Sequence, residues 1–428
     1  QLLLINESQQ IPAISVTDGV IQDSITIQVN GKEQVIGLNL AADQCDFQAG
    51  DHLDPGGMGL TRYANELQPE VALAACEASI ARDPTVGRYH YQLGRALVAL
   101  KRNDEAKVAF ERARDLGHVR AWNALANAKL NEARETGGNS DPRANEDALE
   151  LFARGVEAGD PYAYYSLGRQ FMRFGGTPEI EIEGYDLMMR ALEVGHTFAM
   201  NELGYFYLDE GGEYHDPERG LRYLKESAAR DDIYGFNNMG IVHLRGLGGS
   251  QVDYPAAFDM FVKAAEGGHP NGAANVGWMY LEGQAPGGVD NTKAVNWFAE
   301  GLSRGDARSG EAAGWLVANK KVEGYDRFDA AIFAAKGAAL TNQEASAGAL
   351  NLLKGLDRKT LAGGAQKLIV ELGGEVTVDG AFGPGSQAAM DAVLEQLGAG
   401  PAKTDPVERI LQLATLSWTT SPFRVDLY

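Results

Sequence analysis

One short block of the sequence recurs at a nearly fixed interval along the middle of the chain. Its clearest copy is Ala199-Met-Asn-Glu-Leu-Gly-Tyr-Phe-Tyr-Leu208, and the copies align on a central glycine. Successive aligned glycines are 36 or 37 residues apart, at Gly168, Gly204, Gly240, Gly277 and Gly314. Because a fixed period of roughly 20 to 50 residues is typical of stacked supersecondary units, the sequence predicts a repeat protein.

Each repeat contains two segments with helical periodicity, joined by a polar turn. The second segment ends at a glycine followed by a polar residue, at Gly159, Gly195, Gly268 and Gly305. A glycine just past a helix end takes the left-handed conformation that other residues avoid. The aligned glycine inside the first segment costs about 1 kcal/mol relative to alanine. Its recurrence therefore predicts that a partner helix approaches closely at this point.

The repeat also carries a family resemblance, which is clearest between residues 275 and 305. The residues that carry it are Asn275, Gly277, Tyr280, Asp290, Lys293, Ala294, Trp297, Phe298 and Gly305. This pattern resembles Sel1-like repeats, relatives of the tetratricopeptide repeat. The resemblance covers roughly residues 85–340, and only the lengthened turn between Asn131 and Asn145 departs from it. It implies an all-α fold, a right-handed α-solenoid of about seven helix-turn-helix repeats.

Residues 1–45 have a different pattern, which predicts an extended segment with a short β-hairpin. Short strands are expected at residues 11–16 and 24–29, and residues 32–36 alternate after Asn30-Gly31. Asn-Gly between alternating segments is a strong hairpin signal, because both turn residues must accept positive φ. Since a lone hairpin is marginally stable in water, we expect it to pack on the end of the solenoid, on a preceding domain or on a partner.

Residues 341–428 leave the repeat pattern and contain a second motif, Asp379-Gly380-Ala381-Phe382-Gly383-Pro384. The two glycines suit tight turns, Phe382 suits a loop anchor, and Ser386 suits a helix cap. The motif resembles the small three-helix peptidoglycan-binding module of cell-wall hydrolases, although Val393-Leu394 stand where that family usually has Phe-Gln. The resemblance implies a small C-terminal helical module followed by a tail, peptidoglycan as a ligand, and a periplasmic or secreted protein.

The two cysteines, Cys45 and Cys76, flank a predicted linker and first helix over residues 46–84. They are either a disulfide that clamps the linker to that helix or two buried thiols. The oxidising compartment implied by the C-terminal motif favours the disulfide. A disulfide closing a loop of this size is worth about 3–4 kcal/mol in the chain-entropy model.

The overall charge excludes some classes of partner. The chain has 38 basic and 59 acidic residues and a formal net charge of −21. Nucleic-acid affinity comes largely from clustered Lys and Arg, so no nucleic-acid partner is expected. No apolar run reaches the ~18 residues needed to span a bilayer, so no transmembrane span is predicted.

The sequence offers no convincing catalytic or metal-binding constellation. It contains no phosphate-binding glycine loop, no His-Glu-x-x-His and no Cys-x-x-Cys, so no cofactor is expected. His118, His196 and His269 recur only because the repeat recurs. Equivalent repeat positions lie on the order of 10 Å apart, too far for ligands that must reach within about 2 Å of one metal. Cys45 is not expected to be catalytic, because no histidine precedes it.

The resemblance also indicates where a partner would bind. In tetratricopeptide-type stacks the first helix of each repeat lines the concave face, through residues six and three before the aligned glycine and one and five after it. Asparagine amides there can hold a peptide main chain, aromatic rings supply contact area, and arginines favour a carboxylate. The alternative is that about half of these residues pack between helices. The candidates are Tyr165, Arg169, Arg173, Asn201, Tyr205, Asp209, Asn237, Arg245, Trp278 and Trp315.

We therefore predict a non-enzymatic scaffold of the bacterial envelope that binds a partner protein or peptide in the concave groove. Two alternatives remain open. The order of Cys-containing linker, helix at residues 91–97, repeats and C-terminal motif also resembles the non-catalytic part of bacterial caspase-like proteins. The chain would then be the recognition or regulatory portion of a cysteine protease whose catalytic domain lies upstream. The other alternative is a peptidoglycan-binding protein in which the repeats act as a spacer.

Overall fold

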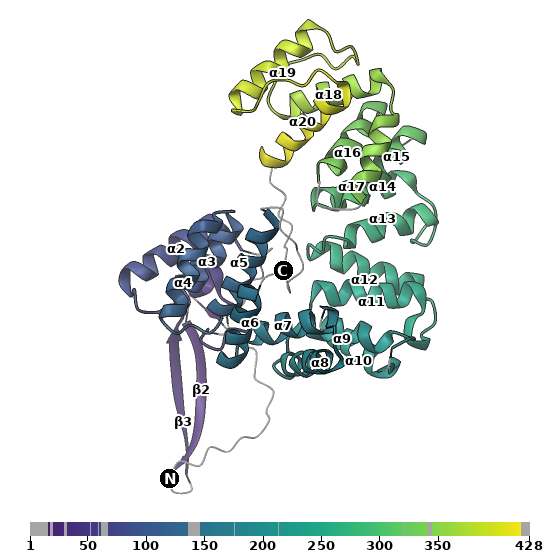
Figure 1. Cartoon of the computed structure of the whole chain (residues 1–428). Coiled ribbons are helices and arrows are strands. Elements are labelled where there is room, and N and C mark those ends of the chain that lie inside the picture. The colour runs from purple at the N-terminus through teal and green to yellow at the C-terminus, as the bar shows by residue number, and fades with distance from the viewer. Residues whose placement is uncertain are drawn as a thin grey trace. The chain divides into compact units, whose positions relative to one another are not determined.

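The structure is a computed structural model (Figure 1). It describes residues 16–17, 20–29, 32–51, 53–58, 60, 67–135, 146–174, 176–212, 214–320, 322–340 and 345–420. The chain divides into two compact units, unit 1 from Gln1 to Ala199 and unit 2 from Met200 to Tyr428.

Unit 1 contains an antiparallel sheet of strand order β1-β2-β3 (purple in Figure 1). The strands are β1 (Val16–Thr17), β2 (Val20–Val29) and β3 (Lys32–Ala41). The register pairs Val29 with Lys32 and Ile25 with Ile36, so the connection falls at residues 30–31. The predicted hairpin is confirmed, with longer strands than expected. Residues 11–15, where another strand was expected to start, lie outside the described residues.

The helices of unit 1 begin with one that the sequence did not predict. An Asp43 capping box starts α1, because the Asp43 side chain accepts from Cys45 N–H at 3.0 Å and Asp43 N–H donates to Asp46 at 3.3 Å. The stretch expected to be a linker therefore opens with a short helix. The unit 1 helices are α1 (Gln44–Ala49), α2 (Pro69–Arg82), α3 (Gly87–Ala99), α4 (Asn103–Asp115), α5 (Ala121–Glu135), α6 (Glu146–Ala158), α7 (Pro161–Phe174) and α8 (Pro178–Glu193).

Helix α9 (Thr197–Leu208) contains the boundary between the units, and the remaining helices belong to unit 2. They are α10 (Pro217–Ala229), α11 (Ile233–Arg245), the 3-10 turn η2 (Leu247–Gly249), α12 (Tyr254–Glu266), α13 (Gly272–Glu282), α14 (Asn291–Ser303), α15 (Ala307–Asn319), α16 (Arg327–Ala339), α17 (Ala345–Gly355), α18 (Arg358–Glu371), α19 (Pro384–Gln396) and α20 (Pro406–Thr420). The helix pairs from α3–α4 to α15–α16 correspond to the seven expected repeats. The predicted α-solenoid of about seven helix-turn-helix repeats is confirmed.

The second helices of three repeats start at an aspartate cap. Asp216, Asp253 and Asp290 each accept a hydrogen bond from the backbone N–H three residues later, at 2.9–3.0 Å. This contact satisfies one of the unpaired N–H groups at a helix start. The Asp that follows the turn in each of these repeats therefore fixes where α10, α12 and α14 begin.

Three of the aligned glycines, counting Gly94 of the first repeat, sit where a phenylalanine ring of the second helix reaches the first helix. A Cβ on Gly94 would lie 2.3 Å from Phe110, one on Gly240 would lie 2.5 Å from Phe261, and one on Gly277 would lie 2.8 Å from Phe298. Real Cβ contacts are not this short, so only glycine lets the helices pair at this distance. The close approach predicted from the sequence is present.

The junctions between successive repeats alternate between two residue types. Asp232 accepts from Gly235 N–H at 2.8 Å, and His269 Nδ1 accepts from Asn271 N–H at 3.1 Å. Burial and, to a smaller extent, the charge of Arg304 lower the pKa of His269 to about 3, so the ring stays neutral and can accept. All six junction residues are buried: His118, Asp160, His196, Asp232, His269 and Asp306.

Helices α18, α19 and α20 form the predicted small helical module at the end of unit 2 (Figure 1). Leu368, Met390 and Leu413 pack in one core with Ala331 and Ala335 of α16. Trp418 Nε1–H donates to the Lys336 carbonyl at 3.0 Å. The module and the last repeat therefore share a hydrophobic core.

Candidate binding surfaces on the first helices

The first-helix face of a unit is the surface presented by the first helices of its repeats. In unit 1 these helices are α3, α5 and α7, and in unit 2 they are α11, α13 and α15 together with the unit 2 part of α9. Most sequence-predicted partner-binding residues come from these helices. The two faces are built differently.

An acidic segment of the chain lies on the first-helix face of unit 1. We call this segment, Cys45–Asp51 with Leu53 and Asp54, the acidic strap. Asp46 is fully buried and accepts from Arg88 Nε at 3.0 Å and from Gln92 Nε2 at 2.9 Å. Both partners belong to α3. The first carboxylate of the strap is therefore fixed by the first repeat.

The second carboxylate of the strap is bound by a buried arginine. Asp51 accepts from Arg120 Nε and Nη2 at 3.1 and 2.9 Å and from the Tyr91 hydroxyl at 2.9 Å. Burial by itself raises the pKa of Asp51, but Arg120, Arg95 and the hydrogen bonds lower it by more, so the pKa lies well below its ordinary value. Asp51 is therefore an ionised carboxylate inside the protein.

Arg120 connects the strap to a third repeat. Its Nη1 donates to Asp160 at 2.8 Å, and its guanidinium lies 3.6 Å from the Tyr162 ring centroid. Asp160 is fully buried. Burial raises the pKa of Asp160 by more than Arg120 lowers it. The pKa of Asp160 therefore lies above its ordinary value, whereas the pKa of Asp51 lies below it.

Backbone groups of the strap are bound as well. Arg95 Nη1 donates to the carbonyls of Ala49 and Gly50 at 2.6 and 2.7 Å, where α1 ends. A cation at the last carbonyls of a helix satisfies unpaired acceptors and interacts favourably with the helix dipole. Nearby, His118 Nε2 lies 3.3 Å from Asp54 Oδ2. The strap thus contacts the first-helix face through carboxylates and carbonyls alike.

A disulfide joins the start of the strap to α2. It connects Cys45 and Cys76, both fully buried. Of the two interpretations left open by the sequence, the structure has the disulfide. The sequence suggested a clamp at this point but not what it clamps, which is the strap on the first-helix face.

The arginines and tyrosines that hold the strap occupy groove-lining positions of the repeat. Arg88 and Arg120 lie six residues before the aligned position, Tyr91 three before it and Arg95 one after it. In unit 1, Arg88 and Arg120 at these positions bind carboxylates of the same chain, whereas Arg95 binds backbone carbonyls.

The other predicted residues of unit 1 lie on α7. Tyr165 is half-buried, and its ring stacks on His196 with centroids 4.8 Å apart. Arg169 is half-buried and Arg173 is exposed. Tyr165 thus contributes to packing at a repeat junction.

In unit 2, two predicted binding residues are used between repeats. Asn201 is 7 % exposed and Asn237 is 6 % exposed. Asn201 donates to Asp232 at 3.0 Å and accepts from Asn238 Nδ2 at 3.0 Å, and Asn237 accepts from Asn275 Nδ2 at 2.8 Å. These amides link neighbouring first helices, so they do not offer a full donor and acceptor pair to a peptide.

A row of apolar side chains marks the outer surface of the same helices. We call the residues one position after the aligned glycine, Tyr205, Ile241, Trp278 and Trp315, the aromatic row. Trp278 is 38 % exposed and Trp315 is 46 % exposed, whereas Tyr205 and Ile241 are half-buried. Trp278 is held edge-on against the buried Phe298 with centroids 5.1 Å apart. Trp278 is therefore exposed and is also held in position by its contact with Phe298.

Charged residues border the aromatic row at the position five after the aligned glycine. Asp209, Arg245 and Glu282 occupy it in successive repeats, and all three are exposed. Burial raises the pKa of Tyr205 to about 12, and Arg245 acts in the opposite sense. Arg245 is thus close enough to the row to influence its tyrosine.

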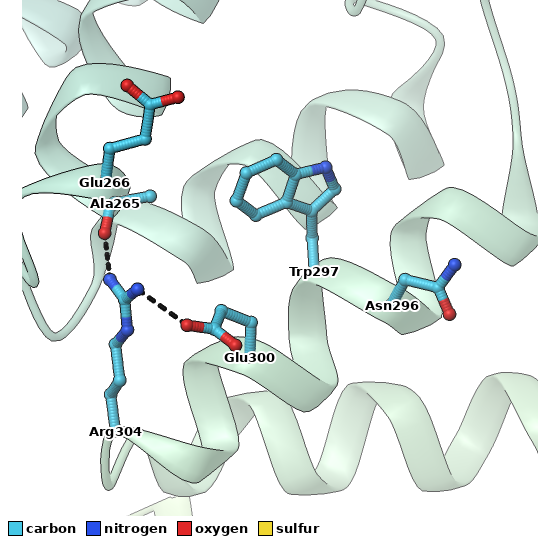
Figure 2. Close-up of a pocket in the computed structure, with 6 residues that line it drawn as sticks. All are labelled: Ala265, Glu266, Asn296, Trp297, Glu300 and Arg304. Atoms are coloured by element: carbon cyan, nitrogen blue, oxygen red, sulfur yellow. Dashed lines mark hydrogen bonds and ion pairs between the residues drawn. The ribbon is translucent and has the colours of Figure 1, made fainter.

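The second helices of unit 2 carry a hollow that the sequence did not indicate (Figure 2). It measures about 350 Å³. Arg304 closes one side by donating to the Ala265 carbonyl and to Glu300, and the Trp297 indole stands beside the opening (Figure 2). With its arginine already paired, the hollow offers little unsatisfied polarity. Its lining residues are Ala265, Glu266, Asn296, Trp297, Glu300 and Arg304.

The C-terminal motif is organised by a buried glutamine, Gln366. Its Nε2 donates to Asp379 at 2.9 Å and to Ser386 at 3.0 Å, and its Oε1 accepts from Gly380 N–H at 2.8 Å. The hydrogen bond from Gln366 lowers the pKa of the exposed Asp379. In the sequence, Gln366 begins the Gln-x-Leu pattern of residues 366–368 in the preceding helix.

The loop that Gln366 holds borders a second, open hollow of about 510 Å³. Asp379, Gly383 and Pro384 contribute to its lining. Phe382 is half-buried, and the Arg409 guanidinium lies 4.0 Å from its ring centroid. Phe382 packs against the core of the module, whereas Asp379 is exposed.

The described residues lack two further features. They contain no group of three or more His, Cys, Asp or Glu side chains that could hold a metal ion. None of the helices within the described ranges is long and apolar enough to cross a bilayer.

Comparison with known proteins identifies the repeats. Residues 197–232, 237–269 and 270–306 match the family model for the Sel1 repeat, so the Sel1-like repeats predicted from the sequence are present. The matched segments include most of the aromatic row. The chain matches none of the curated proteins.

Several solved structures resemble the chain weakly. A Sel1 repeat protein from Oxalobacter formigenes is 20% identical, with a TM-score of 0.42, over 53% of this chain and 89% of that one. A protective antigen of uropathogenic Escherichia coli with an SLR fold, c5321, is 19% identical, with a TM-score of 0.39, over 86% and 77%. The immunity protein Pa5087 of Pseudomonas aeruginosa is 19% identical, with a TM-score of 0.35, over 46% and 72%. These scores are low, so the assignment of the repeats rests on the family match and on the helix pairs themselves.

Proposed function

We propose that this Sel1-repeat chain is a non-enzymatic scaffold that binds a partner protein or peptide on the first-helix face of unit 2. The observation that carries the proposal is the exposure of Trp278 and Trp315, 38 % and 46 %, at equivalent positions of two successive repeats. Large aromatic side chains dominate the energy of protein interfaces. Repeat stacks also use such surfaces for extended partners.

The first-helix face of unit 1 supports the proposal by example. There the same repeat positions bind a segment of polypeptide through its carboxylates and carbonyls, as Arg88 and Arg95 do for the strap. Surfaces of this architecture are thus able to hold a chain segment. In unit 2 the position equivalent to Arg95 holds the exposed Trp278 and Trp315 in two successive repeats.

An affinity pulldown tests the proposed site. The full chain and a Trp278→Ala/Trp315→Ala variant are used as baits in an envelope extract, and captured proteins are identified by mass spectrometry. We expect a captured protein to be lost with the double variant. A Trp297→Ala bait is the matched control, because Trp297 lies on a second helix, and it is expected to retain the protein. Loss with Trp297→Ala and retention by the double variant would move the interface to the second helices.

The envelope location belongs to the same proposal. The Cys45–Cys76 disulfide supports it, because disulfides persist in oxidising compartments such as the periplasm. Mass spectrometry of the thiol-alkylated protein, isolated from cells without reduction, tests the location through the cysteines. We expect no alkylation at Cys45 or Cys76, and complete alkylation would argue for a reducing compartment.

A second candidate function is peptidoglycan binding by the C-terminal module. The specific observation is the loop that Gln366 orders, which leaves Asp379 accessible beside an open hollow. Co-sedimentation with purified peptidoglycan tests it, with Asp379→Ala as the variant and Asp391→Ala as an exposed control on α19. Sedimentation lost only with Asp379→Ala would support glycan binding, and no sedimentation of the native chain would contradict it.

A further inference from the structure

We infer that Trp278 and Trp315, the exposed tryptophans on the first-helix face of unit 2, each bind an arginine side chain of the partner. The guanidinium stacks on the indole ring and donates to a glutamate one helical turn away. That glutamate is Glu282 for Trp278 and Glu311 for Trp315. This inference rests on the proposed function, because it identifies the chemistry of the partner at the same tryptophans.

Each glutamate lies on the same side of its helix as the tryptophan. Glu282 follows Trp278 by four residues in α13. Glu311 precedes Trp315 by four residues in α15. Side chains four residues apart on an α-helix are neighbours, with Cβ atoms about 5–6 Å apart. Each indole therefore has a carboxylate beside it on a single helix, whatever the distance between the repeats.

Neither carboxylate is paired with a cation of the chain itself. Helix α13 contains no Lys or Arg, and the one basic residue of α15, Arg308, donates to Asp306 at 3.2 Å. Glu282 is exposed and Glu311 is half-buried. Within the described ranges, neither glutamate forms an ion pair, and no Lys or Arg lies over either indole ring. Both ring and carboxylate are thus available to a cation from outside.

Neighbouring residues hold one member of each pair in position. Trp278 packs edge-on against the buried Phe298, with centroids 5.1 Å apart. The Glu311 carboxylate lies against Gly348 of α17, where a Cβ would clash with it. Because these groups are already placed, a bound guanidinium orders fewer side chains, and the entropic cost of binding is smaller.

Elsewhere the chain holds cationic side chains by the same combination of ring and carboxylate. In unit 1 the Arg120 guanidinium lies 3.6 Å from the Tyr162 ring centroid and donates to two buried aspartates. In unit 2 the Lys293 ammonium lies 5.3 Å from the Tyr280 ring centroid and 3.6 Å from Asp290 Oδ2. At the two exposed tryptophans the ring and the carboxylate are present without the cation.

Shape and charge favour arginine as the bound side chain. Indole is the best ring for a cation–π contact, and a planar guanidinium can stack on it while donating two hydrogen bonds to a carboxylate. The net charge of −21 attracts a basic partner. The other members of the aromatic row differ, because Ile241 has no ring and Tyr205 already has Arg245 near it. Only the two tryptophans are therefore expected to bind arginine.

Fluorine NMR of the full chain labelled with fluorotryptophan tests the inference. The chain has five tryptophans, and Trp→Phe substitutions assign their signals. The probe is N-acetyl-arginine amide, and N-acetyl-citrulline amide is its uncharged control. We expect the arginine amide to shift the Trp278 and Trp315 signals saturably and to bind about tenfold more tightly than the citrulline amide. The Trp297 signal should not move.

Glutamine variants provide matched controls, because they remove one charge and keep the side-chain shape. Glu282→Gln should weaken binding at Trp278 by about fivefold and leave binding at Trp315 unchanged. Glu311→Gln should do the reverse. Equal binding of the two amides, no shift at either tryptophan, or binding that neither variant weakens would overturn the assignment.

The pulldown separates this inference from the proposed function. If capture requires Trp278 and Trp315 but the arginine amide does not bind there, the arginine assignment is overturned and the proposed site stands. If the amide binds at both tryptophans while capture is independent of them, the arginine sites are supported and the proposed interface fails. Independence of capture together with no binding of the amide would overturn both.

Discussion

The first-helix faces of the two units carry different chemistry on one repeat scaffold. In unit 1 the position one after the aligned glycine holds Arg95, which binds carbonyls of the acidic strap. In unit 2 the same position holds Trp278 and Trp315, which remain accessible. The difference shows that the scaffold fixes where a ligand can lie, whereas a few positions per repeat decide which ligand it is.

The comparison extends to stability. Unit 1 buries the ions that bind its strap, so removing one partner exposes another ion to a dry interior. On the first-helix face of unit 2 the buried Asn201 and Asn237 are neutral amides, and the rings of Trp278 and Trp315 are exposed. Substitutions at equivalent positions should therefore affect folding in unit 1 and binding in unit 2.

The largest effect should follow loss of Arg120, the buried arginine that binds Asp51 of the strap. Arg120→Ala leaves Asp51 and Asp160 buried without their shared cation, and breaking a buried ion pair costs about 3–5 kcal/mol. Urea denaturation measures the change in the free energy of unfolding. Arg112→Ala, an exposed arginine of α4, is the control and should change it by less than about 0.5 kcal/mol. A loss below about 1 kcal/mol for Arg120→Ala would show that the strap is not held by this ion cluster.

The next effect should be equal in both units, because the packing of helix pairs is common to them. Gly94→Ala and Gly277→Ala each place a methyl group within 3 Å of a buried phenylalanine, at 2.3 and 2.8 Å. Overpacking of this kind costs about 1–3 kcal/mol. Thermal denaturation of both variants checks this, with Gly385→Ala as the control because open space surrounds that glycine. Little change in Tm for only one of the two variants would mean that the units differ in packing as well as in surface chemistry.

The pH dependence of the free energy of unfolding should differ between the two units, by a smaller amount than the effects above. The pKa of buried His269 is about 3, below its ordinary value of 6.5, so acidification favours the unfolded chain, which binds the proton. Its contribution is complete above pH 6.5 and is lost as pH falls toward 3, by about 1.4 kcal/mol per pH unit. Asp51 has a lowered pKa and keeps its contribution until pH falls below about 3.8. The raised pKa of Asp160 acts in the opposite sense, favouring the folded state on acidification.

Hydrogen exchange of peptides from each unit at pH 6.5 and 5.0 measures this difference, after correction for the intrinsic exchange rate. Peptides from α13 and α14 should lose about 2 kcal/mol of protection, while those from α3 and α5 should keep theirs. His269→Asn should flatten the pH dependence, and His215→Asn, an exposed histidine, should not. The same loss in α3 and α5 would show that the two units do not titrate separately.

The smallest effect on folding should come from the aromatic row. Trp315 is 46 % exposed, so Trp315→Ala should change the free energy of unfolding by less than about 1 kcal/mol in urea denaturation. Capture of a partner protein in the pulldown should nevertheless be reduced. A loss of several kcal/mol would mean that Trp315 is part of the core, and the contrast between the two faces would then disappear.

Much of the fold could be predicted from the sequence because the repeat makes each signal occur several times. The spacing of Gly168, Gly204 and Gly240 fixed the period, and Asn30-Gly31 located the hairpin turn. Helix α1 was missed because a single capping box, at Asp43 and Asp46, starts it within a Gly- and Asp-rich stretch.

The candidate site was predicted less completely, for a physical reason. Position in the repeat identifies which residues point toward the first-helix face, but not whether a neighbouring helix covers them. Asn201 and Asn237 are covered, whereas Trp278 and Trp315 are not. The position of the strap on the first-helix face could not be predicted either. Its contacts join Asp51 to Arg120, which are 69 residues apart, and no local sequence pattern indicates such a pairing.

The alternation of histidine and aspartate at the repeat junctions has a consequence for the length of the molecule. From His118 to Asp306 the residue type returns only after two repeats, at intervals of 72 to 78 residues. The smallest segment that can be inserted or deleted without placing like residues at successive junctions is therefore a pair of repeats. A chain shortened by one repeat would put two aspartates or two histidines in neighbouring caps, whereas one shortened by two would keep its order. The junction residues therefore have a period of two repeats, whereas the helix pairs have a period of one.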